Sequence, residues 1–147
     1  SLRNPYVPQL ATFLRDSGFE VFDDWYAAGP HADDHWMEYE KFDREHSFAE
    51  ALEGYAAWHV YEYDKEHIEA ADAVVLVMPA GKSSHLELGY AAGIGKKTFI
   101  LMDKEPERYD VMYRFADKVV FKVEELVEAL QEAGRLFQGD KKNVDHE

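Results

Sequence analysis

The residues with the clearest chemical potential lie between Gly81 and Glu87. They follow the apolar run Ala73–Met78, which predicts a strand buried on both faces, and they lead into a predicted helix. Ligands of open α/β sheets bind at the carboxyl ends of strands, where helix N-termini present N–H donors and a positive dipole. A carboxylate near such a helix start is kept ionised and can attack an anomeric carbon. The segment therefore predicts a ligand site with an acidic nucleophile, Glu87, and two hydroxyls, Ser83 and Ser84.

The same segment also has a purely structural interpretation. The spacing from Ser84 to Glu87 matches a capping box, in which Ser84 caps the helix and Glu87 bonds back to the cap amide. On this interpretation the helix runs from Ser84 to about Ala92 and ends in Gly93-Ile94-Gly95. In the first interpretation the Glu87 carboxylate lies in a ligand cleft. In the second it accepts a hydrogen bond from the backbone amide of Ser84.

The residue spacing does not match the motifs for nucleoside triphosphate hydrolysis or for metal binding. The Gly81-Lys82-Ser83 sequence lacks the first glycine of a phosphate-binding loop, because Leu76 stands at that position. Gly93–Thr98 fails because it leads into a strand. No metal-ligand spacing separates His59, His67 and His85, and we expect neither a metal nor another cofactor.

Strands and helices alternate along the chain without hairpin signals, which predicts a parallel sheet flanked by helices. We expect helices at Pro8–Ser17 (capped by Gly18), within the aromatic-rich Trp36–Tyr55, at Asp64–Ala71 and at Val123–Phe137; a loop at Asp23–Asp34; and strands at Phe19–Phe22, Lys97–Met102 and Lys118–Phe121. The expected fold is a three-layer α/β sandwich with a five-stranded flavodoxin-like or Rossmann-like sheet, whose first strand lies upstream of residue 1. Residues 1–137 form the expected domain, and residues 138–147 a polar C-terminal tail.

Composition limits the partners of this chain. It has 147 residues, 46% of them hydrophobic, a formal net charge of −14 and no cysteine. Such an acidic surface repels phosphate backbones and anionic lipid, so we expect neither a nucleic-acid polymer nor a membrane as partner. The longest apolar run, Ala73–Ala80, is too short to span a bilayer, and nothing at the N-terminus resembles a signal peptide. We therefore expect a cytoplasmic protein.

The segment Ala71–Lys96 resembles the core motif of the nucleoside 2-deoxyribosyltransferase superfamily, which includes 5′-nucleotide N-glycosidases. The resemblance extends in both directions. Ser1-Leu2-Arg3-Asn4 resembles the loop after the family's first strand, and Asp64, eight residues before Asp72, has the spacing of the family's second active-site carboxylate. Pro106-Glu107 with Asp110–Met112 resembles a segment that reaches into a neighbouring subunit's active site.

The resemblance implies a role for each matching residue. Glu87 would form a covalent glycosyl ester, while Asp64 assists proton movement at the base or orients the sugar. Ser1 and Arg3 would contact the sugar or a 5′-phosphate, and Asp110 and Met112 would act from a neighbouring copy, which implies a homodimer or higher homo-oligomer. The family has Asp or Ser at the sugar-binding position where this chain has Gly81, so Ser83 or Ser84 would take over that contact, and Asp110 replaces the family's usual asparagine.

The loop Asp23–Asp34 is the expected site of base binding. Aromatic faces stack on bases and carboxylates bond to base edges, which makes Asp24 and Trp25 candidate ligands. Trp36, Tyr39 and Phe42 also have a simpler interpretation as the packed face of one helix.

The resemblance implies cleavage of the N-glycosidic bond of a (2′-deoxy)nucleoside or its 5′-monophosphate, with transfer of the sugar to another base. A 2′-deoxynucleoside 5′-monophosphate N-glycosidase, with water as acceptor, is the first alternative. A non-catalytic nucleotide-binding sensor is more distant, and an NAD-cleaving domain fits the motif less well.

Overall fold

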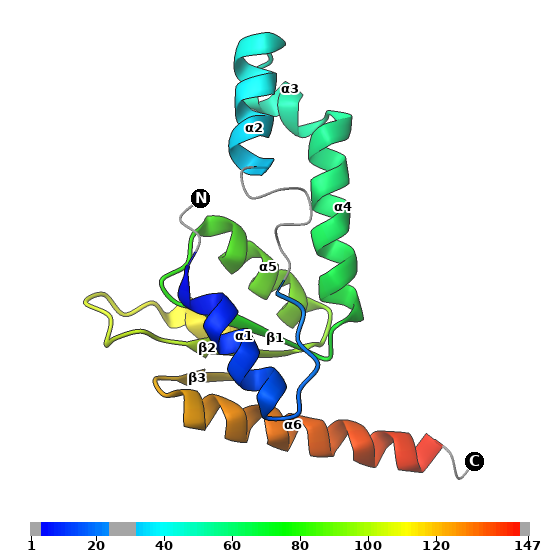
Figure 1. Cartoon of the computed structure of the whole chain (residues 1–147), viewed down its shortest axis with the longest axis vertical. Coiled ribbons are helices and arrows are strands. Elements are labelled where there is room, and N and C mark those ends of the chain that lie inside the picture. The colour runs from blue at the N-terminus through cyan, green and yellow to red at the C-terminus, as the bar shows by residue number, and fades with distance from the viewer. Residues whose placement is uncertain (1–3, 24–31, 145–147) are drawn as a thin grey trace.

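The computed structural model describes residues 4–23 and 32–144 (Figure 1). Its elements in chain order are α1 (Tyr6–Asp16), α2 (Ala32–Glu38), the π-helical turn η1 (Tyr39–Asp43), α3 (Phe48–Leu52), α4 (Tyr55–Ala70), β1 (Ala73–Val77), α5 (Lys82–Gly93), β2 (Lys97–Leu101), the 3-10 turn η2 (Val111–Phe115), β3 (Lys118–Val120) and α6 (Val123–Val144). The part of the chain so described is a mixed α/β structure.

The strands form a parallel sheet. Among the described residues the sheet has three strands in the order β1-β2-β3. Val75 lies opposite Phe99, and Leu101 opposite Val120. β1 pairs with β2 and β2 with β3 in parallel, so the predicted parallel pairing is confirmed. A crossover segment between successive strands brings the chain back to the end of the sheet where the strands begin.

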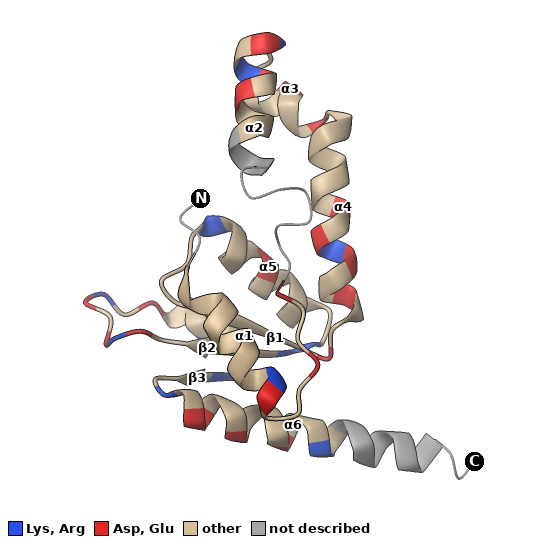
Figure 2. Cartoon of the chain, in the orientation of Figure 1, with Lys and Arg blue, Asp and Glu red and all other residues tan. Residues whose placement is uncertain are grey.

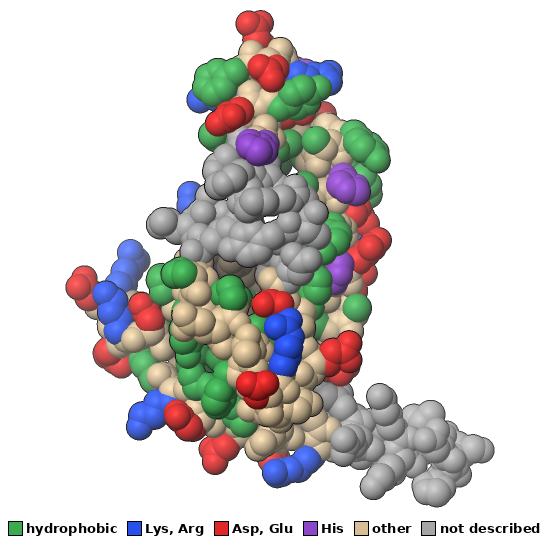
Figure 3. All heavy atoms as spheres, viewed as in Figure 1, with side chains coloured by type: hydrophobic (Ala, Val, Ile, Leu, Met, Phe, Trp, Pro, Cys, Tyr) green, Lys and Arg blue, Asp and Glu red, His purple; other side chains and the backbone are tan. Residues whose placement is uncertain are grey.

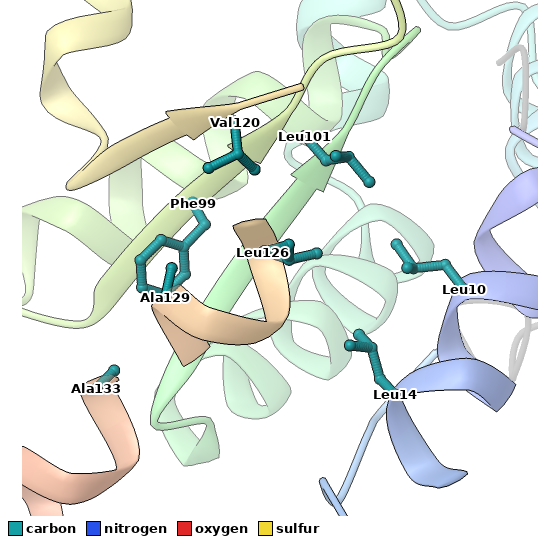
Figure 4. Close-up of a cluster of buried hydrophobic side chains, with 8 residues drawn as sticks. All are labelled: Leu10, Leu14, Phe99, Leu101, Val120, Leu126, Ala129 and Ala133. Atoms are coloured by element: carbon teal, nitrogen blue, oxygen red, sulfur yellow. The ribbon is translucent and has the colours of Figure 1, made fainter. Parts of the chain in front are cut away.

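Helices cover both faces of the sheet, because successive strand residues point to opposite sides. On one face, Phe99 and Leu101 join α1 and α6 in a cluster of buried side chains (Figure 4), completed by Leu10, Leu14, Val120, Leu126, Ala129 and Ala133. On the other face, Ile100 packs with Leu76 and with Leu88 of α5. β1 and β2 are therefore fixed between α1 and α6 on one side and α5 on the other.

Gly18 ends α1 as predicted. Its φ of +97° is left-handed, the Gly18 N–H donates to the Arg15 carbonyl, and the Phe19 N–H donates to the Leu14 carbonyl. These two bonds form a Schellman cap. The prediction of a strand at Phe19–Phe22 is wrong, since this segment pairs with no strand among the described residues. Phe19 and Val21 instead pack against the α1–α6 cluster.

The chain between α1 and β1 is more helical than predicted. The helix expected to begin at Asp64 begins at Tyr55, with Gly54 as its extended N-cap. α2 begins at Ala32, inside the predicted loop. Figure 1 shows α2, η1, α3 and the first half of α4 standing apart from the sheet. We call residues 32–61 the helical arm.

The last helix is longer than predicted. α6 continues to Val144, so the predicted polar tail is helical up to that residue. Its apolar face holds the sheet through Leu126, Ala129 and Ala133. No helix in the described ranges has the length and apolar character that crossing a bilayer requires.

Candidate functional site

The start of α5 is the centre of the candidate site. The helix begins at Lys82, two residues before the predicted start, and its N-cap Gly81 is extended, with φ −89° and ψ −170°. As a glycine, this N-cap residue has no side chain with which to cap the helix. The capping-box interpretation of Ser84 and Glu87 is therefore wrong: Ser84 already lies inside the helix, where it cannot act as the cap.

Glu87 is placed one turn into α5 by the same shift. We expected it in the first turn, but the first turn of α5 contains no acidic residue and Glu87 falls in the second. Its side chain is half-buried, at helical spacing from half-buried Ser84 and fully buried Ala91. Ser83 and Gly81 are exposed. On the side of α5 that carries Glu87, burial therefore decreases from Ala91 toward the exposed helix start at Gly81.

Asp64 lies within α4, one turn before buried Ile68, and is half-buried. Asp64 therefore does not cap a helix, which is the structural role that its place at the start of the predicted helix Asp64–Ala71 suggests. α4 is tied to α5 by the Tyr90 hydroxyl, which donates to Glu69 Oε1 at 2.5 Å. This bond lowers the pKa of Glu69 and raises that of Tyr90. The two predicted carboxylates are thus carried by two helices in direct contact.

Asn4 fixes the start of the chain at the carboxyl end of β1. Its Nδ2 donates to the Met78 carbonyl at 3.2 Å, and its Oδ1 accepts from the Tyr6 N–H at 3.0 Å. The end of the predicted Ser1–Asn4 loop therefore lies beside the strand that leads to Gly81. The predicted ligand residues Ser1, Arg3, Asp24 and Trp25 lie outside the described residues.

Asp110 serves as a cap in this chain. Its Oδ1 accepts from the Met112 N–H at 2.9 Å and so begins the turn η2. Met112 itself is 60% exposed. Asp110 and Met112 thus lie on an open surface, and their predicted action on a neighbouring copy stays a prediction.

A histidine that sequence reasoning left without a role joins η2 to the start of α5. His85 Nδ1 lies 2.7 Å from the Gly81 carbonyl, and Nε2 lies 2.8 Å from the Tyr113 hydroxyl. A carbonyl only accepts, so Nδ1 carries the proton, and in the neutral ring Nε2 accepts from Tyr113. The four-residue spacing of Gly81 and His85 was the available signal, but it depended on knowing where the helix begins.

Elsewhere in the described ranges, no three His, Asp or Glu side chains gather as a metal ion would require. An open hollow of about 500 Å³ lies between α6 and the amino ends of β2 and β3, where Lys97, Lys118 and Glu132 line it. It is at the opposite end of the strands from Gly81, so it is not part of the candidate site. No family model matches the chain, and a search of curated proteins finds no match.

Proposed function

We propose that the chain cleaves the N-glycosidic bond of a (2′-deoxy)nucleoside or its 5′-monophosphate and transfers the sugar to another base. Glu87 attacks the anomeric carbon, the carbon–nitrogen bond to the base breaks, and an ester between Glu87 and the sugar forms. Asp64 assists proton movement at the departing base. Attack on the ester by a second base regenerates the carboxylate, with overall retention.

The observation that carries this proposal is the position of Glu87. Glu87 is half-buried and lies in the second turn of α5, a helix that starts with the N-cap glycine Gly81 at the carboxyl end of β1. Ligands of α/β sheets bind at this place. The sequence resemblance supplies the reaction, and the contact between α4 and α5 supports a site shared by Asp64 and Glu87.

The finer fold and the assembly belong to the same proposal. A five-stranded flavodoxin-like sheet in three layers would extend the parallel sheet described above. The resemblance of Asp110–Met112 to an intersubunit segment supports a homodimer or higher homo-oligomer.

The direct test incubates the chain with deoxynucleosides and with deoxynucleotides, in each case with and without a second free base, and separates the products by chromatography. Glu87→Gln should abolish product formation, and Asp64→Asn should lower it about 100-fold or more. Glu128→Gln, the same change at an exposed position of α6, is the control and should leave the rate unchanged. Acid-quenched enzyme should carry a sugar adduct on the peptide containing Glu87. An active Glu87→Gln variant would refute the assignment.

The hydrolase alternative is favoured by the charge around the start of α5. The first turn contains Lys82 and no acidic residue, and the positive end of the helix dipole there favours an anion such as a 5′-phosphate. Release of free sugar phosphate from a deoxynucleotide without any second base would identify the hydrolase. Product formed only in the presence of a second base would exclude it.

A further inference from the structure

The turn that begins α5 has little packing of its own. Ala80, just before the turn, packs against the cluster that also contains Leu88, but residues 81–83 are exposed. A Cβ placed on Gly81 would meet no heavy atom within 4 Å, so open space surrounds this position. Glycine has more backbone freedom than any other residue. The turn therefore depends on hydrogen bonds to keep its conformation.

His85 supplies the shorter of two hydrogen bonds to the Gly81 carbonyl. The backbone N–H of His85 donates to this oxygen over 3.3 Å, whereas the imidazole Nδ1 lies 2.7 Å from it. N–H···O bonds in proteins usually measure about 2.7–3.2 Å, so the backbone bond is long and the imidazole bond is not. A carbonyl oxygen has two lone pairs and accepts both bonds. The imidazole thus restrains the N-cap residue of α5 from within the helix.

Tyr113 fixes the imidazole in its turn. The Tyr113 hydroxyl lies 2.8 Å from His85 Nε2, and the two ring centroids are 5.6 Å apart. The Tyr113 ring packs against the buried cluster of Leu76 and Ile100. Both ring nitrogens of His85 are engaged, so a half-turn of the ring would break both bonds. A continuous series of contacts therefore runs from the core through Tyr113 and His85 to Gly81.

The turn held in this way carries candidate ligand residues of the proposed site, Gly81, Ser83 and Ser84. In Figure 2 the start of α5 is coloured as basic, and the acidic colour appears only further along the helix. The helix dipole favours an anionic group at this end. A turn that is ordered before its ligand arrives loses less conformational entropy on binding, which raises affinity.

We propose that His85 is a positioning residue, which preorganises the Gly81 turn for the sugar or the 5′-phosphate of the substrate. This inference rests on the proposed function. His85 acts through Gly81, whereas Glu87 is held separately, because its neighbour Leu88 is buried in the core. Loss of the imidazole should therefore weaken substrate binding more than it slows the chemical step.

Steady-state kinetics with the substrate identified in the direct test above separates these two effects. His85→Ala should raise KM about 5-fold, the factor that corresponds to one lost intramolecular hydrogen bond. The value of kcat should change less than about 2-fold, as expected when only ground-state binding is lost. His85→Asn keeps an amide donor beside the position of Nδ1, so its KM should lie within about 2-fold of the unmodified value. Tyr113→Phe removes only the bond to Nε2 and should raise KM less than His85→Ala does.

Two control variants separate this role from general effects. Histidine side chains also lie on the surface of the helical arm, as Figure 3 shows, and His59 of the arm is exposed. His59→Ala should leave KM unchanged. Gly18→Ala strains the cap of α1, so it controls for a general loss of stability and should also leave KM unchanged. Circular dichroism checks that each variant is folded.

The outcomes distinguish this inference from the proposed function. A folded His85→Ala variant with unchanged KM overturns the inference while the proposed function stands, as does a His85→Asn variant no better than His85→Ala. An unmodified chain that forms no product overturns the proposed function instead. Nitrogen-15 relaxation, which needs no substrate, tests the hold on the turn in either case. His85→Ala should lower the order parameter of the Gly81 amide, and an unchanged value overturns the inference.

Discussion

Removing the Tyr113 hydroxyl should weaken the attachment of η2 to α5. Tyr113→Phe keeps the ring, which packs against the cluster of Leu76 and Ile100, and deletes only the bond to His85 Nε2 at 2.8 Å. Both partners are half-buried, so the bond is worth about 1 kcal/mol of unfolding free energy, the usual value for an intramolecular hydrogen bond.

Urea denaturation measures this difference. Tyr109→Phe is the control, because the Tyr109 hydroxyl also makes a 2.8 Å bond, to Glu105, but its side chain is 77% exposed. The control should change the unfolding free energy by less than about 0.5 kcal/mol. A double-mutant cycle of Tyr113→Phe with His85→Ala should give a coupling energy of about 1 kcal/mol, which isolates the pair from the other contacts of His85.

Nitrogen-15 spectra of the imidazole give an independent readout. The Gly81 carbonyl beside Nδ1 predicts the Nδ1–H tautomer for neutral His85. The reasoning fails if the ring is found as the Nε2–H tautomer, or if the coupling energy is zero within error.

Three further predictions concern stability. Leu126→Ala should lower the free energy of unfolding by about 2–5 kcal/mol, because this side chain is fully buried between α6 and the sheet. Leu136→Ala, at an exposed position of the same helix, should lower it by less than about 0.5 kcal/mol. Equal losses of unfolding free energy would contradict the packing. The hydrogen bonds from Ser47 lower the pKa of Glu50 in the folded chain. The capping box therefore contributes stability above the unfolded-state pKa of Glu50 and loses it as pH falls through the folded-state pKa. Carbon-13 titration of Ser47→Ala should show the pKa of Glu50 back in its ordinary range. Gly18→Ala should destabilise the chain by about 1 kcal/mol, since its φ of +97° is unfavourable for alanine, and an unchanged melting temperature would refute the cap.

The strands were predictable because their signal is local. Continuous β-branched and apolar residues at Ala73–Met78 and Lys97–Met102 predict strands buried on both faces, and strands lie at both places. β2 is buried from Thr98 to Leu101, whereas β1 is half-buried except at Leu76. Phe19–Phe22 has three apolar residues and Glu20, and it pairs with no strand among the described residues. Phe19 and Val21 pack against the core without forming a strand, since strand formation depends on a partner.

The capping-box pattern shows the limit of predicting a helix start from a short sequence motif. The capping-box spacing occurs at Ser47–Glu50 and at Ser84–Glu87. The first forms, with the Glu50 N–H donating to Ser47 Oγ and the Ser47 N–H donating to Glu50 Oε1. The second does not form, because α5 has already begun at Lys82. The pattern fits both places equally, and only the path of the backbone distinguishes them.

The amino-acid sequence by itself determined the parallel strands, the cap at Gly18 and the acidic character of the chain, because each depends on residues adjacent along the chain or on composition. The tertiary structure alone decided that Glu87 lies beyond the first turn of α5 and that His85 meets Tyr113. His85 and Tyr113 are 28 residues apart in sequence, and their bond exists because the sheet brings α5 and η2 together. Such contacts depend on distances in space, which spacing along the chain does not encode.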